Sequence, residues 1–260
     1  MVLHDTGGDG PPVLFLHGAL VDGSLWDAVV ERLGGRRCLV PTLPLGSHPQ
    51  AVDDRSRLTP QGVTEMVFEL IEALDLRELT VVGNDTGGAL MQLLVASHPT
   101  DRIARLVFTN CDAFEVFPPW MFKPMFALGR APAALAAAVA PMRIGALRRL
   151  PIAYGWLSKR APDEALERWV RPALSDREIL RDAAHFVARA DLALLLDAAP
   201  SLRRFEGEVV VGWAAEDRCF PLELGRRLAA QFDDSRFVEI EDSYAFVPMD
   251  RPDALAALIA

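Results

Sequence analysis

An aspartate lies in a glycine-rich turn at residues 83–88, which read GNDTGG. A strand, then Gly-x-nucleophile-x-Gly, then a helix forms a sharp turn that presents the central side chain at the carboxyl edge of a sheet. Residues 79–83 have the pattern of a buried strand, and residues 89–97 have that of a helix. We therefore predict that Asp85 is the presented side chain, a carboxylate that can attack carbon or move a proton.

Two further aspartates come directly after predicted strands. Asp112 follows the apolar run 103–109, and Asp217 follows the run that begins at residue 209. The carboxyl ends of parallel strands meet at one edge of a sheet, so these carboxylates and Asp242 are expected around one pocket, where like charges raise at least one pKa. For Asp112 and Asp242 we favour capping of a turn, while Asp112 stays a catalytic candidate.

The elements that must position these residues alternate between short apolar runs and amphipathic segments, which predicts parallel βα units. No strand pattern occurs between residues 112 and 209, where an Ala-rich and Arg-rich stretch intervenes. We predict an α/β fold whose core comprises residues 1–114 and 201–260, with a helical cap formed by residues 115–200.

The order of these landmarks resembles the α/β-hydrolase superfamily, whose mostly parallel central sheet is flanked by helices and carries an inserted helical cap. The resemblance rests on the elbow, on His17-Gly18 after the first clear strand, on Asp217, and on residues 245–252. It implies that the backbone N–H groups of Ala19 and Thr86 form an oxyanion or leaving-group site, and that Asp217 supplies the acid.

The elbow aspartate is similar to that of haloalkane dehalogenases and epoxide hydrolases. In those branches the aspartate forms an ester with an alkyl carbon, and a histidine activates the water that hydrolyses it. Ala245 stands at the position that matches this histidine. We therefore expect the second half-reaction to be severely slowed, so that the ester accumulates. His17, near the expected pocket, and His185, on a predicted cap helix, do not replace Ala245 by position.

Markers of the individual branches are mostly missing. Haloalkane dehalogenases usually have Trp after the nucleophile, where this chain has Thr86. Epoxide hydrolases polarise the epoxide with two cap tyrosines, and this chain has only Tyr154 and Tyr244, the latter outside the predicted cap. Trp120 and Trp156 are candidates for the lining of an apolar pocket, although packing is the commoner role of aromatic residues in helices.

Composition limits the partners. The net charge of −9 argues against nucleic acid, and no apolar run is long enough to span a bilayer. The three scattered cysteines have no metal-type spacing and indicate reduced thiols in the cytoplasm. We expect a small-molecule substrate, no metal and no cofactor; both a monomer and a homodimer are compatible with the sequence. Residues 115–200 carry 12 Lys and Arg residues against 9 Asp and Glu residues. We expect most of these charged side chains to lie on the solvated surface.

The sequence thus predicts a cofactor-independent hydrolase that acts on a small, mostly apolar epoxide, halide or ester-like molecule. Its catalytic candidates are Asp85, Asp217 and Asp112. Two alternatives remain open. One is a lyase, isomerase or cyclase that uses Asp85 for proton transfer and needs no histidine. The other is a non-catalytic ligand-binding protein that keeps the fold.

Overall fold

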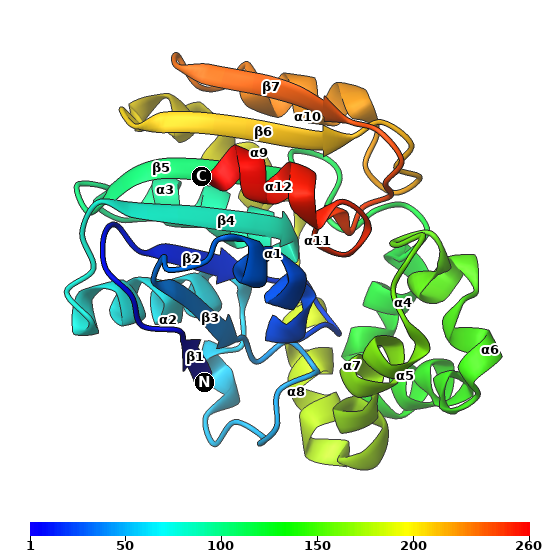
Figure 1. Ribbon diagram of the computed structural model, residues 1–260. Helices are drawn as coiled ribbons and strands as arrows, with labels where there is room; N and C mark the ends of the chain where they lie inside the picture. Colours follow the sequence, from blue (N-terminus) through cyan, green and yellow to red (C-terminus); the bar gives the residue numbers. More distant parts are fainter.

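The computed structural model describes residues 1–260 and is built around a seven-stranded sheet in the order β1-β3-β2-β4-β5-β6-β7 (Figure 1). The strands are β1 (Val2–Asp5), β2 (Val13–Leu16), β3 (Cys38–Thr42), β4 (Leu79–Asp85), β5 (Ile103–Cys111), β6 (Glu208–Ala214) and β7 (Ser235–Ile240). β1 is antiparallel to β3, and the other neighbouring pairs are parallel. The prediction of a mostly parallel sheet is confirmed.

The central strands are buried on both faces, which explains why they are continuous apolar runs instead of alternating ones. In β6, neighbouring residues face opposite layers. A Cβ at Gly212 would lie 2.5 Å from Leu258 of one layer, whereas Trp213 packs against Gly225 of the other. The sheet therefore forms the middle of three layers.

Helices cover both faces of the sheet (Figure 1). On one face lie α1 (Asp27–Arg32) and α12 (Pro252–Ile259); on the other lie α2 (Pro60–Ala73), α3 (Thr86–Ser97) and α10 (Leu222–Ala229). Shorter pieces are η1 (Gly23–Trp26), η2 (Arg55–Arg57) and α11 (Val247–Asp250). The hydroxyl of Thr59 accepts from the N–H of Gly62 at 2.9 Å, and Pro60 is the first residue of α2, so this helix begins with a favourable cap and first residue.

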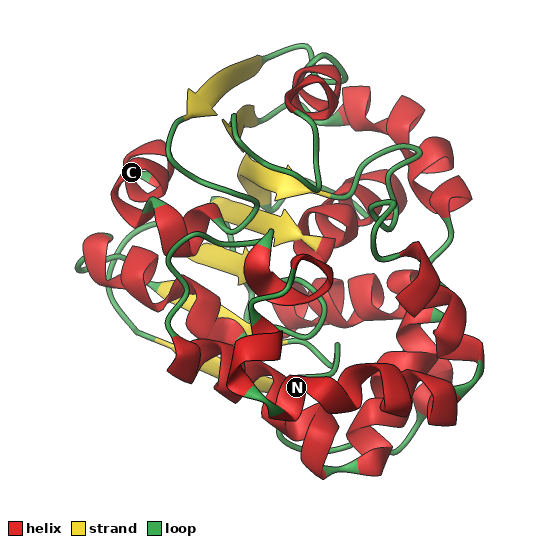
Figure 2. Cartoon of the chain, turned by 90° about the vertical axis from the view of Figure 1, so that its right-hand side faces the viewer, coloured by secondary structure: helices red, strands yellow, loops and turns green.

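Between β5 and β6 the chain contains only helices, and we call residues 117–204 the helical segment. It comprises α4 (Lys123–Ala127), η3 (Leu128–Arg130), α5 (Pro132–Val139), η4 (Ala140–Arg143), α6 (Gly145–Arg148), η5 (Pro151–Gly155), α7 (Asp163–Ser175), α8 (Arg177–Val187), α9 (Leu192–Ala198) and η6 (Ala199–Arg204). The arrowheads of the parallel strands point towards α4–α8, and Figure 2 views the molecule from that side. No helix in the structure is both long and apolar enough to cross a membrane.

Two strands differ from the sequence-based expectation. β5 continues to Cys111, two residues past the predicted run, so Asp112 follows it directly. β1 lacks a strand signal because it is an edge strand with mostly exposed residues and so needs no apolar pattern.

Candidate active site

Asp85 is the last residue of β4 and immediately precedes α3. Its backbone has φ 54° and ψ −131°, a conformation that side-chain-bearing residues rarely adopt, so the turn stores strain. Two glycines make this turn sterically possible. A Cβ at Gly87 would lie 1.9 Å from the carbonyl oxygen of Leu16, and one at Gly18 would lie 1.9 Å from Asp85 Oδ2. The Asp85 carboxyl group therefore rests directly on the loop that follows β2.

Two opposing effects set the protonation of Asp85. Burial raises its pKa, and hydrogen bonding by the backbone N–H groups of Thr86 and Ala19 partly offsets this, with a net increase from 3.8 to about 7. No Lys, Arg or His contributes a compensating positive charge to this shift. Near neutral pH the carboxyl group is thus divided between its ionised and protonated forms.

Asp112 lies beside Asp85 at the carboxyl edge of the sheet, where Asp85 pairs with Cys111 in the register of β4 and β5. The Asp112 side chain is buried, its Oδ2 accepts from the hydroxyl of Thr86 at 3.3 Å, and its Oδ1 has no hydrogen-bond partner. Burial, and then the charge of Asp85, raise its pKa well above 3.8. Asp112 therefore caps no turn, and its burial favours the protonated form of its carboxyl group.

Asp217 follows β6 in a more polar setting. Its Oδ2 accepts from Nδ2 of Asn110 at 2.6 Å, and its Oδ1 accepts from the N–H of Cys219 at 2.7 Å. Burial nevertheless raises its pKa to about 7. Asn110 is held in turn by the N–H of Ala214, which donates to its Oδ1 at 2.7 Å. Asp217 does not line the pocket described next, so it can act on Asp85 only through charge.

A pocket of about 770 Å³ opens above Asp85, between the sheet and the helical segment. Hydrophobic residues make up 16 of its 21 lining residues, and Lys, Arg and His are absent from the lining. Asp85, Thr86 and Asp112 bring the polar groups from the core, while Phe122 and Met125 are among the apolar residues from the helical segment. The pocket therefore suits an uncharged, mostly apolar molecule.

None of the five histidines lines this pocket. His17 is buried, with Nδ1 at 2.8 Å from the carbonyl oxygen of Gly18 and Nε2 accepting from the N–H of Leu43 at 2.9 Å. Burial lowers its pKa to about 4. His17 thus orders the loop after β2 as a neutral ring. His185 contacts the carbonyl oxygen of Leu58 at 3.2 Å, away from Asp85.

Ala245 is fully buried and does not line the pocket. Its carbonyl oxygen accepts from Nδ2 of Asn84 at 2.8 Å, and the next N–H, of Phe246, donates to the carbonyl oxygen of Leu157 at 2.6 Å. Leu157 itself lines the pocket. The loop around Ala245 is therefore closed by packing and by hydrogen bonds to both the elbow and the helical segment.

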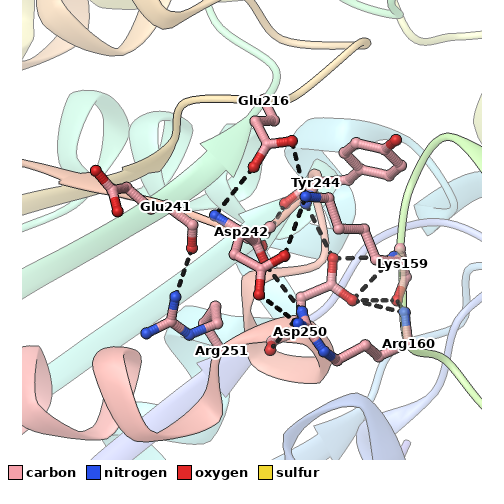
Figure 3. A network of polar contacts seen from close by, with 10 residues as sticks. Lys159, Arg160, Glu216, Glu241, Asp242, Tyr244, Asp250 and Arg251 are labelled. Atoms are coloured by element: carbon pink, nitrogen blue, oxygen red, sulfur yellow. Dashed lines mark hydrogen bonds and ion pairs between the residues drawn. The ribbon is translucent and has the colours of Figure 1, made fainter.

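A polar network fastens this loop to the helical segment (Figure 3). The buried carboxylate of Asp250 accepts from the backbone N–H groups of Lys159, Arg160 and Tyr244 at 2.9–3.0 Å and from the hydroxyl of Ser158 at 2.7 Å. The exposed Asp242 pairs with Lys159 and Arg160, so it caps no turn either.

The aromatic candidates separate into two groups. Tyr154 lines the pocket, but its hydroxyl donates to the carbonyl oxygen of Leu20 at 2.6 Å. Trp120 is 67% exposed, and neither it nor Trp156 or Tyr244 lines the pocket. The rings of Trp156 and Tyr244 instead lie against the guanidinium of Arg218. The apolar residues that do line the pocket had no distinguishing sequence signal, because they look like core residues of short helices.

No group of three or more His, Cys, Asp and Glu side chains is arranged to hold a metal ion. The carboxyl pair of Asp85 and Asp112 supplies the two carboxyl groups that line the pocket. It joins a strained elbow carboxylate that has two N–H donors to a buried acid with one free oxygen.

Comparisons with known proteins agree with this architecture. A model of the alpha/beta hydrolase family matches residues 13–258. Haloalkane dehalogenase 2 of Mycobacterium tuberculosis is 25% identical over 97% of this chain and 87% of its own length. A putative non-heme haloperoxidase of Mycobacterium phage D29 is 26% identical over 42% of this chain, which corresponds to 38% of the phage protein. The crystal structure of an alpha/beta hydrolase fold protein from Burkholderia ambifaria superposes with a TM-score of 0.80, at 20% identity over 99% of this chain and 92% of that one.

Proposed function

Because this chain belongs to the alpha/beta hydrolase family and has its fold, we propose that it is a cofactor-independent hydrolase that opens a small, mostly apolar epoxide. Asp85 is the nucleophile, Asp112 is the acid and base, and the helical segment is the cap that closes the pocket. The free, buried Oδ1 of Asp112, which shares a pocket with Asp85, carries this proposal.

In the first step, an oxygen of ionised Asp85 bonds to an epoxide carbon, and the bond between this carbon and the epoxide oxygen breaks. The released electron pair stays on the epoxide oxygen, which takes the proton of Asp112. A hydroxyalkyl ester of Asp85 and an ionised Asp112 result. The raised pKa of Asp112 supports this role, because it favours the protonated form that a general acid needs.

In the second step, Asp112 takes a proton from a water molecule whose oxygen bonds to the ester carbonyl carbon. The N–H groups of Ala19 and Thr86 stabilise the resulting oxyanion. When this intermediate collapses, the diol oxygen leaves with a proton from Asp112. The proton left on Asp85 then returns to Asp112. Asp85 and Asp112 together thus perform the proton transfers of the histidine that the family places near residue 245.

An epoxide fits the pocket better than the other two substrate classes. A departing halide needs donors around it, and the nucleophile is followed by Thr86 in place of an indole, while the pocket lining contains no tryptophan. Attack of Asp85 on an ester would give an anhydride. An epoxide oxygen, in contrast, needs one proton, which Asp112 can supply.

A single-turnover reaction in ¹⁸O-labelled water tests this function. The protein in molar excess is mixed with styrene oxide or 1,2-epoxyhexane, and the diol and the peptide that contains Asp85 are analysed by mass spectrometry. We expect label in Asp85 and not in the first diol molecule, because the diol oxygen comes from the carboxylate. Asp112→Asn should slow formation of the ester, because the acid is lost, and any ester that forms should persist, seen as an intact-mass increase equal to the epoxide; Asp85→Asn should give neither ester nor diol. Label in the diol alone would contradict a nucleophilic Asp85.

A second candidate is proton transfer by Asp85 in a lyase, isomerase or cyclase. The absence of histidine from the pocket and the pKa of about 7 for Asp85 favour it, because no ester then needs a base for its hydrolysis. Turnover without any adduct, abolished in Asp85→Asn, would support this reaction over epoxide opening.

A further inference from the structure

A second hollow, on the outer face of α8, is surrounded by cations. It measures about 1000 Å³, is open to solvent, and has only one hydrophobic lining residue. It is lined by Arg55 of η2, Arg130 of η3, Arg181 and His185 of α8, and Arg189, which follows the end of α8. This concentration of arginine is unusual in a chain whose net charge is −9.

Two of these arginines have no acidic partner. Arg55 pairs with both Glu178 and the buried Asp182, and Arg181 pairs with Glu178. Arg130 and Arg189 form no ion pair, and the only hydrogen bond that either makes runs from Arg189 Nη1 to the carbonyl oxygen of His185. Two guanidinium groups are thus available to an external anion.

The two acidic residues next to the hollow, Asp182 and Glu178, already have hydrogen-bond or ion-pair partners within the protein. Asp182 has no exposed surface, and it accepts from Arg55, from His48 Nε2 at 3.1 Å and from the N–H of Val52 at 2.8 Å. Glu178 is shared between Arg55 and Arg181. The uncapped N-terminus of α5 also faces the hollow, since Pro132 lines it and Ala131 provides no side-chain hydrogen bond. This helix end adds partial positive charge to that of the arginines.

The charged groups come from three separate parts of the chain. η2 belongs to the core, whereas η3 and α8 belong to the helical segment (Figure 1). The opposite face of α8 lines the apolar pocket through Leu180, Ala183 and Val187. An anion bound in the hollow would therefore connect the core to the helices that cover the catalytic pocket.

We propose that this hollow binds a phosphate group, either as free phosphate or as part of a small phosphorylated molecule. Arg130 and Arg189 supply the primary contacts, and Arg55 and Arg181 supply the surrounding charge. Planar guanidinium groups bind phosphate through paired N–H donors, and a doubly charged group balances two unpaired arginines. Binding fastens η3 and α8 to η2 and so stabilises the closed helical segment. This site does not depend on the reaction at Asp85.

Isothermal titration calorimetry on the full chain tests the site. Inorganic phosphate, pyrophosphate and adenosine monophosphate are titrated at constant ionic strength, with sodium chloride as the reference anion. We expect saturable binding of phosphate-containing probes and none of chloride. Arg130→Ala/Arg189→Ala should weaken binding at least tenfold. Arg203→Ala is the matched control, because Arg203 is also exposed and unpaired but lies in η6, and it should bind like the wild type.

The probes also distinguish the source of the phosphate. Equal affinity for inorganic phosphate and adenosine monophosphate indicates a site for free phosphate, whereas tighter binding of the nucleotide indicates a phosphorylated metabolite; both support the proposal. Thermal unfolding without ligand checks that the exposed substitutions leave the fold intact. Unchanged affinity in the double variant, or no saturable phosphate binding by the wild type, would overturn it.

Discussion

The hydroxyl of Thr86 donates to Oδ2 of Asp112 at 3.3 Å, and this is the one hydrogen bond that the buried Asp112 side chain makes. It links the residue after the elbow aspartate to the end of the neighbouring strand. Thr86 also contributes its backbone N–H to Asp85. One residue therefore contacts both members of the carboxyl pair, through different atoms, and substitution can separate the two contacts.

Thr86→Val removes the hydroxyl and keeps the backbone N–H. The hydrogen bond lowers the pKa of Asp112, so its loss should raise that pKa further and make Asp112 a weaker acid towards the epoxide oxygen. We expect the turnover rate to fall by about 3- to 10-fold, as for one hydrogen bond, and the alkaline limb of the pH–rate profile to move to higher pH. Thr86→Ser retains the hydroxyl and should preserve both the turnover rate and the pH–rate profile. An unchanged profile in Thr86→Val would contradict a role for Asp112.

The stability of the protein should depend on the ionisation of Asp85. Its folded-state pKa of about 7 exceeds the ordinary value of 3.8, so between these values the folded state binds more protons than the unfolded state. This contribution to stability is present at low pH and is lost as pH rises through 7. Asp85→Asn, neutral at every pH, should gain stability relative to wild type between pH 5 and pH 8, by about 1.4 kcal/mol for each pH unit from 5 up to the folded-state pKa of about 7.

Urea unfolding of both proteins at pH 5 and pH 8 measures this difference. Asp54→Asn is the control: Asp54 is exposed, and its hydrogen bonds to Ser56 lower its pKa, so its titration is complete below pH 5. The difference in unfolding free energy between Asp54→Asn and the wild type should therefore be the same at pH 5 and at pH 8. Parallel pH dependence of wild type and Asp85→Asn would mean that Asp85 is fully ionised in the folded protein.

Introducing histidine at position 245 should not introduce histidine catalysis. Ala245 is fully buried outside the pocket, and the added ring would overpack the contact between Asn84, Leu157 and this loop. We expect Ala245→His to lose about 1–3 kcal/mol of stability and to gain no ionisation in the pH–rate profile. Ala245→Gly adds no volume and is the control for the effect that any substitution at this position has on the loop. Faster turnover with a new pKa near 6.5 in Ala245→His would show that the loop opens.

Asp250 should contribute far more to stability than Asp242, although both belong to the network in Figure 3. Asp250 is buried and accepts from three backbone N–H groups and one hydroxyl, whereas Asp242 is half-exposed and forms surface ion pairs. We expect Asp250→Asn to lose about 3 kcal/mol and Asp242→Asn to leave stability nearly unchanged, because solvent screens its ion pairs. Urea unfolding at pH 7 measures both. Equal losses would show that the surface pairs hold the loop.

The sequence by itself determined the parallel sheet, because strands buried on both faces must be continuous apolar runs between turn residues. It also located Asp85, because only small residues at 83, 87 and 88 permit the close approach of strand and helix at the elbow. The edge strand β1 gave no such signal, since its exposed residues satisfy no packing requirement.

The tertiary structure decided which polar residues meet. From sequence, Asp112 and Asp242 both read as turn caps; in the structure, one is a buried acid beside Asp85 and the other a surface ion-pair partner. From sequence, Trp120 was a candidate for the pocket lining and Leu157 had no distinguishing signal; only the packing of the helical segment placed Leu157 in the pocket and Trp120 in solvent. Burial and charge pairing depend on contacts between residues far apart in the chain, and local patterns do not encode them.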